Sequence, residues 1–242
     1  MSWFKNTWFR DPNEKYLFIN DTAVRYRAGI MLVIPLFMAL TLFDVLYTSP
    51  WIVDTSTIED TYDLNEASQI IYSAEMTRRT YDYTAQTTLL LYGLFELLAG
   101  MFVWSSRFSP TIHLATYLAR NKKPEWKPIT PKRFAWGLGL TLVTLCLVFF
   151  NPVIVANWVN ALFGAEVLPT TYNYIPIWFP VNLVWVCIAL MWFEAVLGFC
   201  LGCKIHSLLV WIGVIKEPCY ACNNIDWDAI KRKHEATGQA NT

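Results

Sequence analysis

Four cysteines near the carboxyl end of the 242-residue chain have a spacing that could support metal or thiol chemistry. Cys200 and Cys203 form one C-x-x-C pair, and Cys219 and Cys222 form a second pair after fifteen intervening residues. This spacing lies at the short end of the zinc pattern in which each pair supplies two thiolates to one tetrahedral ion. The first hypothesis is therefore zinc or iron bound by all four sulfurs.

The second hypothesis is that the pairs are dithiols, because a C-x-x-C thiol with a lowered pKa is a nucleophile. We expect Cys200 and Cys203 to lie at the carboxyl end of a helix, where the helix dipole disfavours a thiolate. A reactive thiol there would need help from Lys204 or His206, whereas a bound metal deprotonates the thiol by itself. Cys219 could open a helical turn, which makes the second pair the better candidate nucleophile. Reduced cysteines with a purely structural role are the third interpretation.

Two glutamates inside apolar segments, Glu96 and Glu194, are the other candidates for chemistry. A carboxylate within a membrane suggests proton or ion handling, so a small-solute transporter is a weaker functional hypothesis. Arg25 and Arg133 are the basic residues expected to pair with the glutamates, and we favour this structural role. We expect His206 to be a solvated residue at the membrane interface.

Long apolar segments must position these residues. The chain is 55% hydrophobic and 16% charged, with a mean hydropathy of +0.32, a composition that suits lipid better than water. About 20 residues of helix cross about 30 Å of hydrocarbon. The predicted fold is therefore an all-α integral membrane protein, in which Cys146 and Cys187 are isolated small apolar residues. The four predicted transmembrane helices are 28–47, 87–104, 134–158 and 177–201.

The distribution of charge predicts the orientation of these helices, since lysine and arginine accumulate on the cytoplasmic side. The N-terminal segment 1–27, the loop 105–133 and the tail 204–242 are rich in basic residues, so both termini are predicted to be cytoplasmic. The acidic segment 48–86 is predicted to be external, as a partly helical cap or, equally, as a solvated loop. The two predicted helix pairs occupy residues 28–104 and 134–203.

The two helix pairs resemble each other in sequence. Thr22–Tyr26 matches Thr130–Phe134 ahead of the first helix of each pair, and a Phe-Glu dipeptide recurs in the second helix. In the first half, Phe102 and Ser105 occupy the positions aligned with the first cysteine pair. Because each half has two helices, the chain returns to the same side of the membrane after the first half, and both halves insert in the same orientation. The halves are therefore predicted to be parallel repeats related by an axis along the membrane normal.

Three motifs of the chain resemble a known family. They are Phe108-Ser109-Pro110, Pro131-Lys132-Arg133-Phe134 and Gly198-Phe199-Cys200-Leu201-Gly202-Cys203. In these motifs the chain is similar to the bacterial domain-of-unknown-function family 4395, small four-helix membrane proteins that end in G-F-C-x-G-C. The resemblance implies thiol or sulfur chemistry, because such proteins are often encoded beside thioredoxin-like and rhodanese-type sulfurtransferase proteins. The external segment and the second cysteine pair depart from the family pattern.

The leading functional hypothesis is a multi-pass protein of the bacterial inner membrane whose four cysteines carry out thiol redox or sulfur relay. Its expected partner is a soluble thioredoxin-like or sulfurtransferase protein. The alternative is a non-enzymatic accessory subunit of a larger membrane complex, in which the same cysteines bind zinc or iron. Membrane lipid is an expected contact in either case, and the formal net charge of zero gives no reason to expect nucleic acid.

Overall fold

The structure is a computed structural model of the chain. The second cysteine pair, Cys219 and Cys222, lies outside the described residues, so the predictions that involve this pair stay predictions. The described residues are 5–43, 47, 49, 51–79, 82–170 and 178–216.

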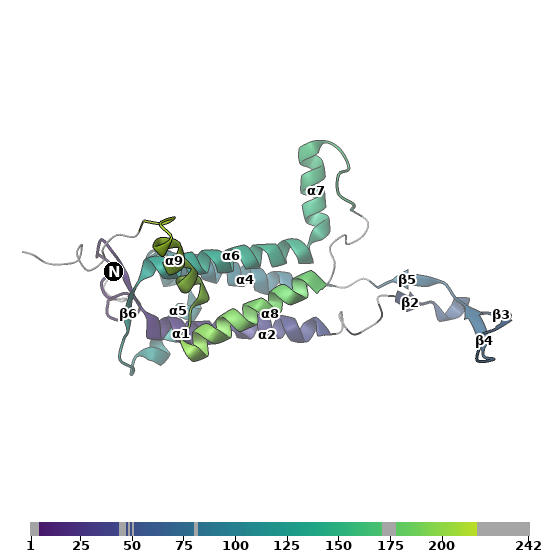
Figure 1. Ribbon diagram of the computed structural model, residues 1–242, viewed down its shortest axis with the longest axis horizontal. Coiled ribbons are helices and arrows are strands. Elements are labelled where there is room, and N and C mark those ends of the chain that lie inside the picture. Colours follow the sequence, from purple (N-terminus) through teal and green to yellow (C-terminus); the bar gives the residue numbers. More distant parts are fainter. Residues whose placement is uncertain are drawn as a thin grey trace, which may run out of the picture.

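Helices that run side by side form the body of the protein (Figure 1). Within the described residues, three stretches are long and apolar enough to cross a membrane, judged by length and composition: Asp21–Thr41, Ile129–Phe150 and Trp178–Leu197. The chain is therefore a mostly helical membrane protein. The helices of the body are α1 (Asp21–Met31), α2 (Val33–Thr41), α4 (Thr84–Met101), α6 (Ile129–Phe150) and α8 (Trp178–Trp192).

The first and third predicted spans have different ends from those predicted. The first helix begins at Asp21 rather than at residue 28, so its basic residues lie inside the helix. The third predicted span, 134–158, is too long, because α6 stops at Phe150 and α7 (Pro152–Phe163) projects away from the bundle (Figure 1). The proline ring restricts the residue before it to non-helical backbone, and Asn151 has φ −128° and ψ 52°.

Helix α4 corresponds to the second predicted span, 87–104, but it is not one of the three stretches. Its 18 residues include threonines and glutamine in the first turns and Glu96 further on. These polar groups have partners inside the protein: the Gln86 side-chain amide, for example, donates to the Thr41 hydroxyl at 3.0 Å. Helix α4 packs against α6 within the bundle, and its buried polar residues are Gln86 and Glu96.

Small elements close the end of the bundle that carries the N-terminal segment. Strand β1 (Phe18–Asn20) pairs antiparallel with β6 (Trp126–Pro128), and α5 (Pro110–Ala119) packs against α1. Trp8 and Phe9 are fully buried in a hydrophobic cluster with residues of α1, α5 and α6. The N-terminal segment is thus an integral part of the fold.

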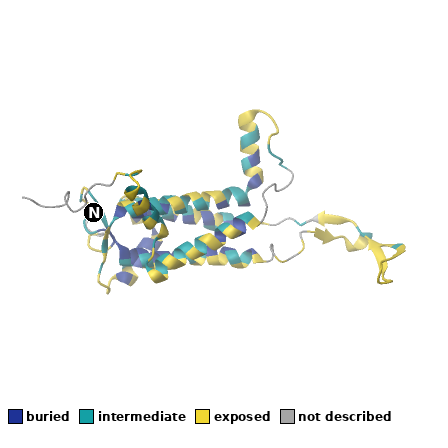
Figure 2. Cartoon of the chain, in the orientation of Figure 1, coloured by how far each residue is buried: buried dark blue, intermediate teal, exposed yellow. Residues whose placement is uncertain are grey.

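The predicted external segment forms a β arm at the opposite end of the molecule (Figure 1). The expectation of helix in this segment is wrong, because Ile70, Ile71 and Tyr72 favour strand and Asn65 makes a turn. The Asn65 side chain accepts from the backbone N–H groups of Ala67 and Gln69, both at 2.9 Å. Exposed residues cover the arm (Figure 2). The antiparallel pairs are β2 (Trp51–Val53) with β5 (Met76–Arg78), and β3 (Glu59–Leu64) with β4 (Ile70–Ser73).

Candidate dithiol site at the start of helix α9

The chain between α8 and the last described helix turns sharply. A π-helical turn, Phe193–Leu197, ends α8, and Gly198 follows in the left-handed conformation with φ +66°. Cys200 is then the N-cap of α9 (Leu201–Trp211). Glycine adopts a positive φ without the steric penalty that a Cβ atom brings, so Gly198 allows the chain to leave one helix and start another within three residues.

Cys200 and Cys203 therefore lie at the beginning of a helix, and the predicted placement at a helix carboxyl end is wrong. The Cys200 Sγ accepts a hydrogen bond from the backbone N–H of Cys203 at 3.4 Å. The Cys203 thiol donates to the same sulfur, with 2.7 Å between the two Sγ atoms. The positive end of the helix dipole and these two donors all favour a thiolate at Cys200.

The two sulfurs have opposite tendencies to ionise. The hydrogen bond from the Cys203 thiol lowers the pKa of Cys200, helped by the Lys132 ammonium and opposed by partial burial and by the Glu194 carboxylate. The same hydrogen bond raises the pKa of Cys203 strongly, because its proton is shared with the Cys200 sulfur, and burial adds to the effect. When the reduced pair ionises, Cys200 therefore loses its proton before Cys203, which stays its hydrogen-bond donor.

A buried lysine links this dithiol to two carboxylates. The Lys132 ammonium lies 2.7 Å from Glu194 Oε1 and 2.8 Å from Asp21 Oδ1. Lys132 is only 4% exposed, so the cluster is well shielded from solvent. Glu194 is thus paired, as a structural role requires, but its partner is Lys132 rather than a predicted arginine.

The two predicted arginines bind backbone carbonyls instead. The Arg25 guanidinium donates to the Val196 carbonyl at 3.1 Å, and the Arg133 guanidinium donates to the Met101 carbonyl at 2.7 Å. Each acceptor lies at or next to the carboxyl end of a helical stretch, where free carbonyls and the helix dipole attract cations. The predicted arginine–glutamate pairs are therefore wrong, although both arginines do tie helices together.

Glu96 lies in a separate polar cluster that is fully buried. Its carboxylate accepts from the hydroxyls of Ser109 and Thr111, both at 2.5 Å, and lies 3.3 Å from the Arg27 guanidinium. Arg27 also donates to the Glu96 backbone carbonyl and to Thr111. The hydroxyl donors and the Arg27 guanidinium all approach Oε2, and this buried ion pair supports the predicted structural role.

Two glycines explain the spacing of the G-F-C-x-G-C motif. Gly198 supplies the left-handed turn, and a Cβ atom there would lie 3.0 Å from Arg25 Cζ. Gly202 lets α9 approach α6, because a Cβ atom at this position would lie 2.6 Å from both Cα and Cβ of Ala135. The motif therefore ends one helix, exposes a cysteine cap and docks the following helix.

The accessory residues predicted from the sequence lie on opposite sides of α9. Lys204 is exposed, so its charge is largely solvated. His206 is 2% exposed, and its ring packs edge-on against Phe134 with 5.5 Å between centroids. The expectation of a solvated His206 is wrong, because α9 turns this side chain toward α6. Lys132, at the start of α6, supplies the positive charge that was predicted to come from these two residues.

The described residues contain only the first of the two cysteine pairs, so zinc or iron bound by all four sulfurs stays a prediction. Within the described part of the chain, no group of three or more His, Cys, Asp or Glu residues could hold a metal ion. Cys200 and Cys203 lie side by side, with 2.7 Å between their sulfurs.

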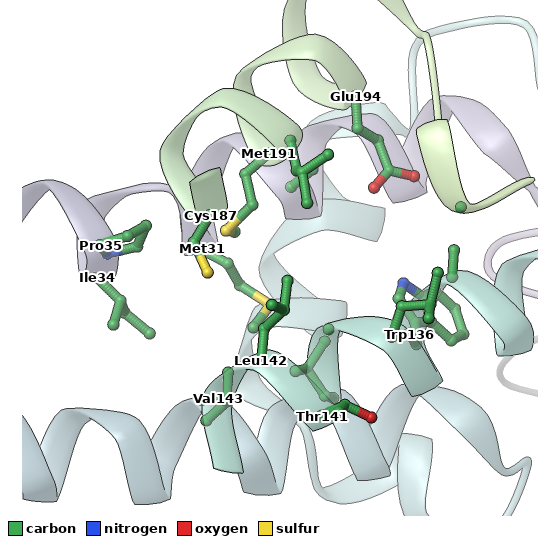
Figure 3. A pocket seen from close by; sticks show the side chains of 18 of the residues that line it. Met31, Ile34, Pro35, Trp136, Thr141, Leu142, Val143, Cys187, Met191 and Glu194 are labelled. Carbon is green, nitrogen blue, oxygen red and sulfur yellow. The ribbon is translucent and has the colours of Figure 1, made fainter. Parts of the chain in front are cut away.

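A cavity of about 350 Å³ lies inside the bundle and reaches the dithiol (Figure 3). Cys200 and Glu194 line it together with Trp136, and most of the other lining residues are apolar. Cys146 and Cys187, predicted to be isolated, both line this cavity from α6 and α8. Figure 3 shows Glu194 and Trp136 at one end and Ile34 and Pro35 at the other end of the lining.

Comparison with protein families identifies the chain. The model of the family described as a domain of unknown function, DUF4395, matches residues 19–210, and the chain belongs to this family. The match includes the first cysteine pair and ends before the second. A search of curated proteins and a search of solved structures found no match.

One signal in the sequence could have placed the dithiol correctly. Glycine directly after an apolar helical run is typical of a helix end, and Gly198 precedes Cys200 by two residues. That signal predicts a new element at Cys200. The contribution of Lys132 and Asp21 has no comparable signal, because these residues are more than 60 positions away from Cys200.

Proposed function

We propose that the protein is a membrane thiol-redox protein in which Cys200 and Cys203 exchange a disulfide with a soluble thioredoxin-like partner. The observation that carries the proposal is the Cys200 sulfur at the helix start, with the Cys203 thiol 2.7 Å away. A disulfide pair whose reduced form is stabilised is an oxidant. The stabilised Cys200 thiolate therefore favours transfer of the disulfide from this protein to its partner.

The exchange proceeds in two balanced steps. A partner thiolate attacks the Cys200 sulfur of the Cys200–Cys203 disulfide, which forms a mixed disulfide and releases the Cys203 thiolate, which takes up a proton. The second thiol of the partner then loses its proton and attacks the partner sulfur of the mixed disulfide. This attack forms a disulfide within the partner and releases the Cys200 thiolate. The partner is oxidised by two electrons and the Cys200–Cys203 pair is reduced by two. The low pKa of Cys200 makes it a good leaving group in the second step.

We propose four transmembrane helices for this protein, α1–α2, α4, α6 and α8, arranged as two parallel helix-pair repeats with both termini in the cytoplasm. The crossed contacts of Arg25 and Arg133 support the repeat, since each binds a carbonyl near the end of the other pair's second helix. The basic loop and α9 lie at one end of the bundle and the acidic arm at the other (Figure 1), in agreement with the positive-inside rule. The proposed location is the bacterial inner membrane.

Trapping of the mixed disulfide tests the function. In a Cys203→Ser variant in lipid nanodiscs, Cys200 should form a stable mixed disulfide with a thioredoxin-like protein that carries an activated disulfide. Cys200→Ser should form none, and Cys187→Ser should behave as the unchanged protein. Labelling of free thiols with a maleimide, followed by mass spectrometry, measures each species.

The alternative functions give different results in the same preparation. One zinc or iron ion per chain that is lost in Cys200→Ser, without a mixed disulfide, would establish the accessory subunit with a metal bound by the four cysteines. A sulfane sulfur on Cys200 after incubation with a rhodanese-type protein and thiosulfate, again without a mixed disulfide, would establish sulfur relay. Either result overturns thiol–disulfide exchange.

A further inference from the structure

A membrane protein that gives its disulfide to a partner must be reoxidised, and the cavity beside Cys200 offers a place for the oxidant. We propose that this cavity binds a lipid-soluble quinone, which oxidises the Cys200–Cys203 dithiol. The inference rests on the proposed function and names the second substrate of the same site. Four properties of the cavity support it: its position, its lining, its size and its contact with only one of the two cysteines.

The cavity lies among the apolar helices of the bundle. Residues of α1, α2, α4, α6, α8 and α9 line it, and the three stretches that are apolar enough to cross a membrane all contribute. Its lining runs from Cys200 and Gly202 at the start of α9 to Met38 and Val184 in the middle of the bundle. This position within the apolar helices suits a ligand that is soluble in the bilayer.

The lining suits a flat, mostly apolar molecule with few polar atoms. Apolar side chains such as Ile34, Leu142 and Met191 make up most of the lining (Figure 3). Trp136 lines the end nearest the dithiol, where an indole can stack on a conjugated ring. Glu194 is a polar group at this end, and its carboxylate can accept a hydrogen bond from a hydroxyl of the reduced ligand.

The volume of about 350 Å³ lies at the lower end of the range of about 300–1,000 Å³ for small-molecule sites. It suits the ring of a quinone with the first part of an isoprenoid tail. A phospholipid chain would also be soluble in the bilayer, but it carries no group that accepts electrons from a dithiol. The requirement for a two-electron acceptor beside Cys200 therefore favours the quinone.

Only one residue of the pair lines the cavity. Cys200 lines it, whereas Cys203 is not among the lining residues. Cys200 is also the residue whose thiolate the helix start stabilises, so the cavity lies beside the residue with the more nucleophilic sulfur. Cys203 lies 2.7 Å behind it and is placed to close the disulfide.

The reaction balances with one proton from water. The Cys200 thiolate and the Cys203 thiol lose two electrons and one proton, and an S–S bond forms between Cys200 and Cys203; water supplies the second proton. The two carbonyl oxygens of the quinone take up both protons, and the ring takes up both electrons, which gives the hydroquinone. The disulfide then passes to the soluble partner, so one turnover moves two electrons from the partner to the quinone in the bilayer.

The test uses the full chain, reduced and freed of reductant, in lipid nanodiscs without oxygen. The probe is a decyl-substituted benzoquinone with every ring position substituted, which leaves no free position for stable thiol addition. We expect one hydroquinone and one Cys200–Cys203 disulfide per chain, measured by absorbance and by maleimide labelling. Cys200→Ser should produce no hydroquinone.

Two variants on the same helix separate binding in the cavity from collision at the membrane. Leu142→Trp fills the cavity and should slow quinone-dependent oxidation by at least about tenfold, or about 1.4 kcal/mol. Leu145→Trp is the matched control, because Leu145 is exposed on α6 and does not line the cavity; its rate should be unchanged. Equal rates in both variants and the unchanged protein would overturn the proposal.

Oxidised glutathione distinguishes failure of the inference from failure of the proposed function. If it forms the Cys200–Cys203 disulfide and the quinone does not, the quinone site is wrong and thiol exchange stands. If neither oxidant forms the bond, both the quinone site and the thiol exchange are wrong.

Photolabelling tests the cavity if Leu142→Trp does not fold. An azido-quinone should label lining peptides of α6 and α8 in the unchanged protein, in competition with the decyl quinone. Labels confined to the outer surface, or labels that the decyl quinone does not displace, would contradict the cavity.

Discussion

The polar cluster around Glu96 and the polar cluster around Glu194 are built alike but differ in what faces the carboxylate. Glu96 lies near the Ser109 hydroxyl, which caps α5, and pairs with Arg27. Glu194 lies near the Cys200 sulfur, which caps α9, and pairs with Lys132. A helix cap that is a hydroxyl in one cluster is a thiol in the other. The comparison teaches that a reactive site can arise from a structural one by exchange of a single capping oxygen for sulfur.

The structure also corrects which residues are equivalent. The sequence alignment places Phe102 and Ser105 opposite the cysteines, whereas helix capping makes Ser109 the counterpart of Cys200. Hydrogen bonds, and not residue order, define this equivalence, because the turn before α5 is longer than the turn before α9.

The largest expected effect follows from removal of the difference between the two clusters. Cys200→Ser gives the second cluster the hydroxyl cap of the first, so the fold should persist while thiol exchange falls to the rate without protein. Ser109→Ala, the matched change in the first cluster, should leave exchange within about twofold, a difference of about 0.4 kcal/mol. Exchange is measured as transfer of a disulfide to a thioredoxin-like protein. Activity retained in Cys200→Ser would show that another cysteine carries the reaction.

The two carboxylates should differ in their contribution to stability. Glu96→Gln leaves the Arg27 charge buried without a counter-charge, and we expect the free energy of unfolding to fall by about 3–5 kcal/mol. Glu194→Gln should cost about 1–2 kcal/mol, because Lys132 keeps its contact with Asp21 at 2.8 Å. Denaturation of both variants in detergent measures the difference. Equal losses would mean that the two clusters are equally dependent on their carboxylates.

Gly202→Ala should loosen the docking of α9 on α6. The added Cβ atom meets Ala135 at 2.6 Å, and relief of such a contact costs about 1–3 kcal/mol of stability. The control is Gly137→Ala on the adjoining helix, where nothing lies within 4 Å of an added Cβ atom; a surface change of this kind stays within about 0.5 kcal/mol. The melting temperature and the rate of Cys203 alkylation measure the effect. A stable Gly202→Ala with unchanged alkylation would contradict the close approach.

The smallest expected effect is on the pH dependence of Cys200. Because the hydrogen bond from Cys203 lowers the pKa of Cys200, the reduced protein should keep a thiolate at lower pH than an unfolded thiol does. The contribution of the thiolate to stability is fully present above the pKa of the unfolded thiol and is lost as the pH falls through the lower folded pKa. Cys203→Ala removes the donor and should move the alkylation profile of Cys200 to higher pH.

Cys203→Ser is the matched control for this shift, since its hydroxyl still donates to the Cys200 sulfur. Its profile should lie between those of the unchanged protein and Cys203→Ala. Iodoacetamide labelling across a pH series, read by mass spectrometry, provides the profiles. Identical profiles for all three would mean that the helix start alone stabilises the thiolate.

The sequence by itself determined the class of protein and its family. Long apolar runs predict membrane helices because helices satisfy their own backbone groups in lipid, and the predicted family is the one whose model matches residues 19–210. The structural role of Glu96 was also predictable, although its partner was not. The ends of the helices were less predictable, since Pro152 ended the third span earlier than hydropathy suggested. The strands of the arm, which depend on a turn at Asn65, were not predicted.

Beyond the local signal of Gly198, the tertiary structure decided the electrostatic character of the cysteine pair. Whether a sulfur meets the negative or the positive end of a helix dipole depends on one left-handed residue, Gly198, and on the docking of α9 against Ala135. The nearby charge comes from Lys132, 62 positions from its partner Glu194. Such distant contacts depend on how the helices pack, and local sequence patterns carry no information about them. The cavity that reaches Cys200 is decided in the same way, by the space that the packed helices leave between them.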